Sequence, residues 1–520
     1  MKPNSRRGPS VARGPEEIEV KLRLPPDARP VLEAQPALHP PRAGTPETRE
    51  EETTYFDTPD GLLARAGASL RVRRSLGRGL VQTLKLAPVA QGAAARRGEW
   101  EWPVGAETPD LGLLAGTPCA DSVPALDRAL TRVCKTEISR TAWRVACAGG
   151  TVVEAAIDQG RIRAGQRDVP VSELELELKA GGPAALYRLA LELVQAVPLA
   201  IEPASKAERG AQLAGRPGPE AVKAEDVVLR PDQPAAEAFA HIMGAALGHL
   251  RLNLPATVRG DVEGVHQVRI AVRRVRAVIA LFKPLLTEEA ASRYNEALRR
   301  VGRLFGAARD WDVFVTATLA EAAAENPAES WPRHLAEAAR PARARAREEA
   351  MRELEAPGFA RLLLELGAWA EEGARDPATL GTPALTRPVA DVAPDLLDRL
   401  MRRAAKQGKG IRHADPRDLH GLRKRLKTLR YGTEFTESLY RPKRVRTLLH
   451  PCKELQELLG SVNDAAATPD LAQHLADSDE SGIAPCLAAL AAWTEGRGKA
   501  ARRRVPKAWH ALRDADPFWA

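Results

Sequence analysis

Residues 172–179, which read SELELELK, constrain the N-terminal part of this chain most strongly. In a β-strand, alternate side chains share a face, so Glu173, Glu175, Glu177 and Lys179 line one side and the leucines the other. Neighbouring carboxylates need water or cations. Taken alone, the pattern favours a surface strand with a solvated polar face. The alternative is a barrel strand whose acids point into a polar, metal-holding lumen and whose leucines pack outside against helices.

The same alternation recurs through the first 210 residues. Residues 17–21 read acid, apolar, acid, apolar, base, and a hairpin is expected around the glycine pair at 149–150. An ordinary sandwich would not separate acids and bases by strand, whereas eight antiparallel strands can close around a small interior. We therefore predict an N-terminal eight-stranded antiparallel tunnel barrel with flanking helices and an ionic lumen. Its candidate strands lie at 17–21, 53–61, 69–74, 82–86, 97–102, 140–147, 151–158 and 173–179.

The net charge and the cysteine spacing indicate the kind of partner and the cellular compartment. The 520 residues carry a net charge of +9, which suggests a polyanionic partner. The five cysteines show no CxxC spacing, so we interpret them as free thiols of a reducing compartment. Residues 1–15 lack the apolar stretch of a signal peptide and are expected to form a flexible tail. The sequence contains no run of about 18 apolar residues, so we expect no membrane span. We expect a cytoplasmic protein.

Several motifs together give residues 16–212 their resemblance to the CYTH family, the triphosphate tunnel metalloenzymes. These are ExExK at 17–21, YFDTPD at 55–60, LRVR at 70–73, RxExE at 97–101, DxG at 158–160, the 173–179 alternation, and Ser205-Lys206 with Arg209-Gly210. The resemblance implies a closed eight-stranded tunnel, a divalent metal, and hydrolysis or rearrangement of a triphosphate.

The residue types fit this chemistry independently. Carboxylates are the ligands that Mg²⁺ or Mn²⁺ takes beside phosphate oxygens, and cations can cradle a phosphate chain. Glu154 is a further carboxylate that could orient water or hold a second metal. The candidate metal ligands are Glu17, Glu19, Glu99, Glu101, Asp158, Glu173, Glu175 and Glu177. The candidate catalytic and substrate-binding residues are Lys21, Arg71, Arg73, Lys85, Arg97, Arg140, Lys179 and Lys206.

A Gly- and Pro-rich stretch at 213–234 is predicted to be a linker, after which the periodicity becomes helical. Residues 235–520 are predicted to form an all-α domain of two repeated bundles, about 235–390 and 391–520. The repeat is visible as a constant offset of 154 residues. It aligns 265–276 with 419–430, and it aligns Leu304, Gly306 and Asp310 with Leu458, Gly460 and Asp464.

Each repeat carries a basic stripe at helical spacing, HxxRxxxRxxR in the first and HxxRxxxKxxR in the second. This pair resembles the CHAD family, the conserved histidine α-helical domains. The resemblance implies two four-helix bundles facing each other across a basic groove that binds inorganic polyphosphate. Either histidine could instead be a structural residue that hydrogen-bonds across the repeat interface. The candidate polyphosphate-binding residues are His266, Arg269, Arg273, Arg274, Arg276, His420, Arg423, Lys424, Lys427 and Arg430.

The leading hypothesis is a metal-dependent inorganic triphosphatase, hydrolysing tripolyphosphate, with a polyphosphate-binding helical domain that would associate with polyphosphate granules. The alternatives are a non-catalytic polyphosphate-binding adapter, and a CYTH-type adenylate cyclase or thiamine triphosphatase, which would share most lumen residues. Nucleic-acid binding is disfavoured because the basic helices nearly lack aromatic stacking residues. No membrane partner is expected, and the sequence does not decide the oligomeric state.

Overall fold

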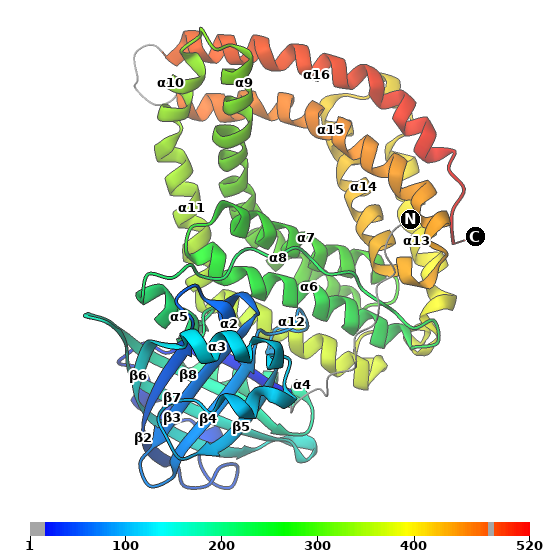
Figure 1. The fold of residues 1–520 in the computed structure, drawn as a ribbon. Coiled ribbons are helices and arrows are strands. Elements are labelled where there is room, and N and C mark those ends of the chain that lie inside the picture. Colours follow the sequence, from blue (N-terminus) through cyan, green and yellow to red (C-terminus); the bar gives the residue numbers. More distant parts are fainter. Residues whose placement is uncertain (1–15, 477–482, 520) are drawn as a thin grey trace. The chain divides into compact units, whose positions relative to one another are not determined.

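The computed structural model describes residues 16–476 and 483–519, and for residues 464–473 and 476 it describes the backbone alone. The chain forms two compact units. The first is β-rich and combines the chain up to residue 221 with segments 251–259 and 354–368, and the second is helical and combines 222–250, 260–353 and 369–520. Figure 1 shows both. None of the helices described is both long and apolar enough to cross a bilayer.

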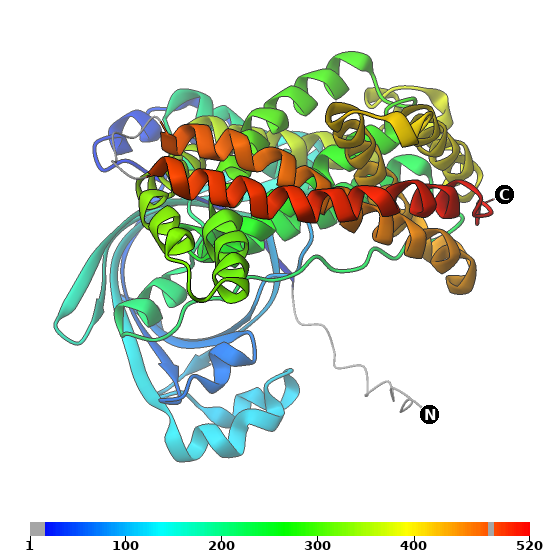
Figure 2. The same ribbon diagram turned by 90° about the horizontal axis from the view of Figure 1, so that it is seen from above.

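The first unit is a closed antiparallel barrel, as predicted. Its strands follow the order β5-β4-β3-β2-β6-β7-β8-β1, and β1 also pairs with β5 and so closes the ring. Seen from above, the strands form a ring (Figure 2). The two-residue β9 (Ala200–Ile201) extends the sheet beside β1. The barrel strands are β1 (Glu16–Arg23), β2 (Glu47–Asp57), β3 (Ala68–Ser75), β4 (Gly79–Leu86), β5 (Ala95–Val104), β6 (Thr131–Ala146), β7 (Val152–Ala164) and β8 (Arg167–Ala180).

All eight predicted strands are present, but several are longer than predicted. Strand β2 begins at Glu47 and β6 at Thr131, well before the predicted starts at 53 and 140. The expected hairpin is found: β6 and β7 pair from Ala146 opposite Val152 down to Lys135 opposite Arg163, around the turn at Ala148–Gly150. Charged residues early in β2 and β6 obscured their strand character.

The hydrophobic core of the barrel lies outside its wall. In β1 and β8, Val20, Leu22, Leu174 and Leu176 are buried on the outer face. There they join a core cluster with the apolar face of helix α4 (Pro183–Ala196), which includes Leu186 and Leu193. The leucines of the 172–179 alternation therefore pack against a helix, and the acids point inward. This settles the choice between a solvated surface strand and a lumen strand.

The barrel unit also contains short helices. The YFDTPD motif has a local structural role, because buried Asp57 accepts hydrogen bonds from the Thr58, Leu63 and Ala64 amides and so holds the turn into α2 (Leu62–Arg65). Helix α5 (Lys206–Leu213) begins with a capping box between Ser205 and Glu208. The remaining helices are α1 (Arg29–Glu33) and α3 (Val123–Ala129).

The helical region shows the predicted repeat in its element boundaries. Helices start at 235, 262 and 288 in the first repeat and at 389, 416 and 442 in the second, an offset of 154 each time. The helices are α6 (Ala235–Val258), α7 (Val262–Phe282), α8 (Glu288–Val313), α9 (Leu319–Glu325), α10 (Trp331–Ala338), α11 (Arg340–Glu355), α12 (Pro357–Arg375), α13 (Val389–Gln407), α14 (Pro416–Thr436), α15 (Pro442–Ala476) and α16 (Ile483–Arg513).

The two repeats differ in continuity. A π-helical turn at Phe314–Thr318 joins α8 to α9, where the second repeat has the single long helix α15. Helices α10 and α11 together cover the segment that corresponds to α16. Helix α7 packs against α14, so the two stripe-bearing helices are neighbours.

Gly160 offers a test of the barrel wall. A Cβ at this position would lie 2.0 Å from the Glu137 carbonyl oxygen on β6, so Gly160→Ala forces the β6–β7 pairing apart. We expect a loss of about 2–3 kcal/mol in the local free energy of opening. Gly165→Ala is the control, because nothing lies within 4 Å of its Cβ and only its positive φ of +60° opposes alanine. Native-state hydrogen exchange of β6 and β7 peptides measures both, and equal protection in the two variants would contradict the steric account.

Candidate functional site

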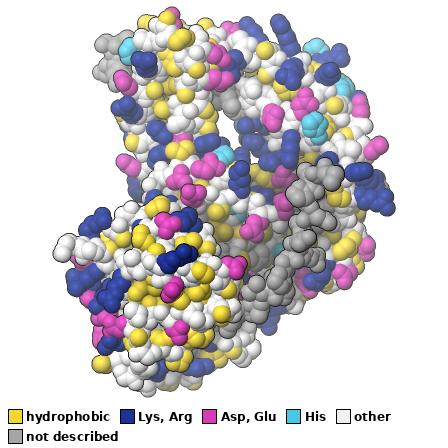
Figure 3. Space-filling view, in the orientation of Figure 1, with side chains coloured by type: hydrophobic (Ala, Val, Ile, Leu, Met, Phe, Trp, Pro, Cys, Tyr) yellow, Lys and Arg dark blue, Asp and Glu magenta, His cyan; other side chains and the backbone are white. Residues whose placement is uncertain are grey.

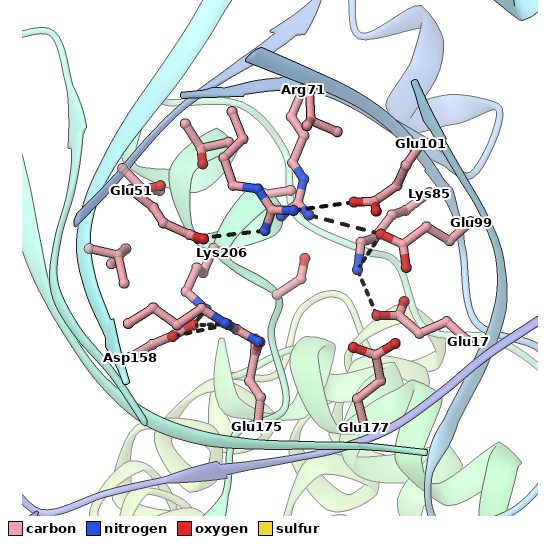
Figure 4. A pocket seen from close by; sticks show the side chains of 18 of the residues that line it. Glu17, Glu51, Arg71, Lys85, Glu99, Glu101, Asp158, Glu175, Glu177 and Lys206 are labelled. Carbon is pink, nitrogen blue, oxygen red and sulfur yellow. Dashed lines mark hydrogen bonds and ion pairs between the residues drawn. The ribbon is translucent and has the colours of Figure 1, made fainter. Parts of the chain in front are cut away.

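The barrel lumen is an ionic cavity of about 380 Å³. Figure 4 shows acidic and basic side chains from several strands pointing into it. All the lumen residues predicted from the sequence line this cavity except Glu173, which lies fully buried behind it. The cavity therefore brings together Glu17, Glu19, Lys21, Arg71, Arg73, Lys85, Arg97, Glu99, Glu101, Arg140, Asp158, Glu175, Glu177, Lys179 and Lys206.

Strand register places opposite charges side by side. Glu17 stands opposite Arg97, Lys21 opposite Glu175, and Lys85 opposite Glu99. Each pairing follows from the period of two, because a residue on the lumen face meets the lumen-facing residue of the neighbouring strand. The ion pairs of the lumen are thus built into the sheet.

One cluster gathers Asp158, Glu173 and Glu175, with carboxylate oxygens within 4.8 Å of one another. Lys206, the first residue of α5, contacts all three, at 2.6 Å from Asp158 and 3.0 Å from Glu175. Burial favours its neutral form, but these carboxylates hold the pKa of Lys206 well above its ordinary value. Lys21 lies 2.8 Å from Glu175. This cluster already holds its own cations.

Arg140 completes the neutralisation of that cluster. Its guanidinium lies 2.8 Å from Asp158 and 2.9 Å from Glu175. Although burial opposes ionisation, Lys206, Lys21 and Arg140 hold the pKa of Glu175 well below its ordinary value. Burial instead raises the pKa of Glu173.

A second cluster gathers Glu17, Glu99 and Glu177, again within 4.8 Å. Lys85 lies 2.7 Å from Glu17 and 3.0 Å from Glu99, while Glu177 pairs with Lys179 at 2.6 Å (Figure 4 shows the Lys85 pairs). Burial raises the pKa of Glu177 despite Lys179. Burial also acts on Glu17, but Lys85 and Arg97 lower the pKa of that carboxyl overall. In this cluster no single cation contacts all three acids among the described residues.

Arg71 is the lumen cation with the weakest neutralisation that the contacts show. Its closest ion-pair contact among the described residues is Glu99 at 3.9 Å, and its buried Nε has no hydrogen-bond partner. Arg73, from the same strand, pairs with Glu101 at 3.3 Å and Glu51 at 3.5 Å. Arg71 is therefore available to an anion that enters the lumen.

Strand β2 contributes lumen residues that were not predicted from the sequence. Arg49, Glu51 and Tyr55 also line the cavity. Tyr55 lies within the predicted strand at 53–61. Arg49 and Glu51 continue the period of two upstream of Thr53, so extending the alternation into the charged 47–52 segment would have found them. Glu154, named only as a further carboxylate, also faces the lumen and lies 3.6 Å from Arg140.

A second candidate site is the basic groove of the helical unit, defined here by the stripes on α7 and α14. Arg269 and Arg423 occupy equivalent positions, and each lies against an equivalent glycine. A Cβ on Gly306 would lie 3.9 Å from the Arg269 guanidinium, and one on Gly460 would lie 3.7 Å from that of Arg423. The repeated glycines thus make room for the repeated arginines. Arg269 pairs with Asp310 at 3.4 Å; the side chain of the equivalent Asp464 lies outside the described residues.

The two stripes meet where α7 packs on α14. Burial lowers the pKa of Arg273 on α7, and Arg269 and Arg430 lower it further. Arg276 donates to Asn295 at 3.1 Å, and Arg430 pairs with Glu434 at 2.9 Å. Figure 3 shows Lys and Arg side chains gathered around a hollow in the helical unit. The structure therefore joins the stripes into one basic surface.

Not every predicted groove residue lies on these stripes. Arg274 is only 7% exposed and its guanidinium lies 4.9 Å from the ring centroid of Phe435, so it packs between helices. Lys424 is exposed on α14, outside the stripe.

The two histidines also differ. His420 hydrogen-bonds to Asn463 of its own repeat, whereas burial and the nearby Arg309 lower the pKa of His266 to about 4. Positions 309 and 463 are equivalent in the repeat, so His266 faces an arginine where His420 has an asparagine partner.

Comparisons with known proteins agree with this geometry. A family model of the CYTH domain matches residues 15–211, and a family model of the CHAD domain matches residues 241–473. A protein of Haemophilus influenzae named inorganic triphosphatase is 34% identical over 158 residues. That match covers 30% of this chain and 44% of the relative, so the chain spans less than half the length of the relative.

Among solved structures, the crystal structure of the CHAD domain from the plant Ricinus communis is similar to the helical region. It is 28% identical, with a TM-score of 0.50, and the match covers 57% of this chain and 99% of that one. Together with the closed barrel and the repeated helices, these matches identify the chain as one that combines a CYTH domain with a CHAD domain.

Proposed function

We propose that the barrel is a divalent-metal-dependent triphosphatase that hydrolyses inorganic tripolyphosphate, and that the helical domain binds polyphosphate. The observation that carries the proposal is the lumen, where carboxylate clusters and a ring of cations share one enclosed cavity. The CYTH match and the relative named inorganic triphosphatase support it. A reducing, cytoplasmic setting agrees with the free cysteines.

The donor set suits a hard divalent cation. Magnesium and manganese take carboxylate oxygens together with water and phosphate oxygens. The cluster of Glu17, Glu99 and Glu177 fits best, because no single described cation contacts all three of its acids, whereas Lys206 contacts all three acids of the Asp158 cluster. Glu19 lies beside this cluster and bonds to Arg97. A bound metal would polarise the phosphoryl oxygens and neutralise charge that develops during transfer.

The remaining lumen residues would bind and orient the substrate. Arg71, with its unpartnered Nε, and Arg73 offer planar guanidinium groups for bidentate contacts with phosphate. Lys85 on the neighbouring strand β4 and Lys179 on β8 add point charges. Glu101 and Glu154 are the lumen carboxylates whose side chains are most exposed, at 47% and 28%, so they are the candidates to orient the attacking water.

The lining favours inorganic triphosphate over a nucleotide. Among the residues that line the described cavity, Tyr55 is the only aromatic one, and it is 7% exposed. An adenine or thiazole ring binds best on an exposed aromatic or apolar surface. A lumen walled by charges instead matches a substrate that is charged along its whole length.

The basic groove supports the second half of the proposal. Arg269, Arg273, Arg423, Lys427 and Arg430 converge from α7 and α14, and polyphosphate carries a negative charge on every unit. The likeness to a solved CHAD domain extends over the helical region that carries this groove. Cytoplasmic polyphosphate, including granules, is the expected partner.

The metal assignment is tested by Glu17→Gln with Glu19→Gln. Because this change removes ligand charge and keeps side-chain shape, we expect Mg²⁺-dependent phosphate release from tripolyphosphate to fall at least about 100-fold. The matched control is Glu137→Gln, which removes an ion-paired carboxylate on β6 that lies 3.2 Å from Arg163 outside the cavity lining. Hydrogen exchange checks that the barrel stays folded. Undiminished turnover in the double variant would show that these glutamates do not bind the metal.

The groove assignment is tested by charge reversal in each stripe. We expect Arg269→Glu with Arg273→Glu, and separately Arg423→Glu with Lys427→Glu, to weaken binding of long-chain polyphosphate by about 10- to 100-fold and to flatten its salt dependence. Arg402→Glu with Arg403→Glu is the control, because both residues are exposed on α13 and lie outside the stripes.

The measurement is calorimetric titration of the full chain without divalent metal, at two salt concentrations. Duplex DNA of equal charge is titrated in parallel. A groove shaped for a slim polyanion binds polyphosphate more tightly than the duplex. Equal affinity for both polymers would indicate unspecific polyanion binding and defeat the polyphosphate assignment.

A further inference from the structure

Lys427 breaks the symmetry of the basic groove. It occupies the position on α14 that Arg273 occupies on α7, 154 residues earlier. Every other cation of the second stripe has a counterpart of its own kind, since Arg423 corresponds to Arg269 and Arg430 to Arg276. An arginine stays charged at any pH that the fold survives, whereas a lysine can lose its proton when burial and neighbouring cations oppose the charge.

The surroundings of Lys427 are cationic on two helices. Arg269 and Arg273 act on it from α7, and Arg423 and Arg430 act on it from its own helix. The side chain is half-buried, and in the described part of the chain no carboxylate lies within ion-pair distance of its ammonium. The nearby acids are engaged elsewhere: Asp310 of α8 contacts Arg269, and Glu434 contacts Arg430.

Among the side chains that the structure describes, the other packed elements supply no counter-charge; the side chain of Asp464 on α15 is not among them. Helix α15 presents Gln456, which donates to the Leu426 carbonyl, and Cys452, whose burial raises its thiol pKa to about 11. It also presents Asn463, which bonds to His420. Helix α13 places Leu397 and Leu400 against Gly432 of α14. His266 of α7 has a pKa of about 4, so it stays neutral above pH 6.

These surroundings have a direct electrostatic consequence. Burial, followed by Arg423, Arg273, Arg269 and Arg430, lowers the pKa of Lys427 to about 7. The amine therefore loses its proton in the empty groove at mildly alkaline pH. A polyanion that neutralises the four arginines removes the repulsion and favours the ammonium form again.

We propose that Lys427 takes up a proton when the groove binds polyphosphate, so that the affinity of the groove rises as the pH falls from about 9 towards 6. This inference rests on the proposed polyphosphate binding. On this inference, Lys427, which stands where the first repeat has an arginine, couples polyphosphate binding to pH.

The direction of the pH dependence follows from the coupling between proton uptake by Lys427 and polyphosphate binding. Below the pKa of the free protein, Lys427 is charged with or without ligand, and the affinity is at its maximum. Between the pKa values of the free and bound forms, binding must draw a proton from solution, so the affinity falls with rising pH by at most tenfold per unit. Above both values the lysine contributes no charge.

The experiment compares the full-length protein with Lys427→Arg and Lys424→Arg. Lys427→Arg restores the residue of the first repeat and keeps the charge at all pH values. Lys424→Arg makes the same substitution at the exposed neighbour outside the stripe. Long-chain polyphosphate is titrated calorimetrically, without divalent metal, at pH 6.5, 7.5 and 8.5, in two buffers of different ionisation enthalpy so that proton uptake is measured directly.

We expect the unsubstituted protein and Lys424→Arg to take up between about half a proton and one proton per Lys427 near pH 8. They should bind about eight- to 25-fold more weakly at pH 8.5 than at pH 6.5. Lys427→Arg should lose that uptake and bind more tightly than the unsubstituted protein at pH 8.5. Equal proton uptake and equal pH dependence of binding in all three proteins would overturn the inference about Lys427 and leave the proposed polyphosphate binding standing. Absence of polyphosphate binding at pH 6.5 in all three would overturn the proposed groove function and this inference with it.

Discussion

The pairing of opposite charges across neighbouring barrel strands is the interaction on which the barrel depends. Because alternate side chains of β1 and β8 face inward, Glu17, Glu19, Glu175 and Glu177 would be costly in an enclosed lumen without partners. The register places Arg97 opposite Glu17 and Lys21 opposite Glu175. The apolar faces then pack outward against α4, so the hydrophobic stabilisation comes from outside the wall and the lumen stays polar.

The charges in the groove of the helical unit are arranged differently from those in the barrel lumen. The groove cations converge without an equal number of acids, and burial together with mutual repulsion lowers the pKa of Arg273 and Lys427. Such a surface carries unfavourable electrostatic free energy that a bound anion would relieve. The duplicated glycines, Gly306 and Gly460, show that each repeat makes space for its stripe arginine in the same way.

The sequence predicted the barrel and most of its lumen because the period of two fixes which side chains share a face. It missed Arg49 and Glu51, because the predicted strand began at 53 and the period of two was not extended into the dense charged run at 47–52, which pairs with β6 and, from Glu51, with β3. It also placed Arg274 with the groove residues, although helical rotation turns this side chain toward Phe435. The contrast between His266 and His420 depends on positions 309 and 463, which a stripe pattern does not include.

Phosphate release from tripolyphosphate, thiamine triphosphate and ATP, each with Mg²⁺ or with EDTA, tests whether the lumen holds a metal and acts on an inorganic triphosphate. A lumen whose lining residues are mostly charged and include one buried aromatic residue predicts that kcat/KM with Mg²⁺ is highest for tripolyphosphate, by at least about tenfold. It also predicts that EDTA abolishes release. Equal or faster turnover of ATP or thiamine triphosphate, or release that EDTA leaves unchanged, would contradict the account.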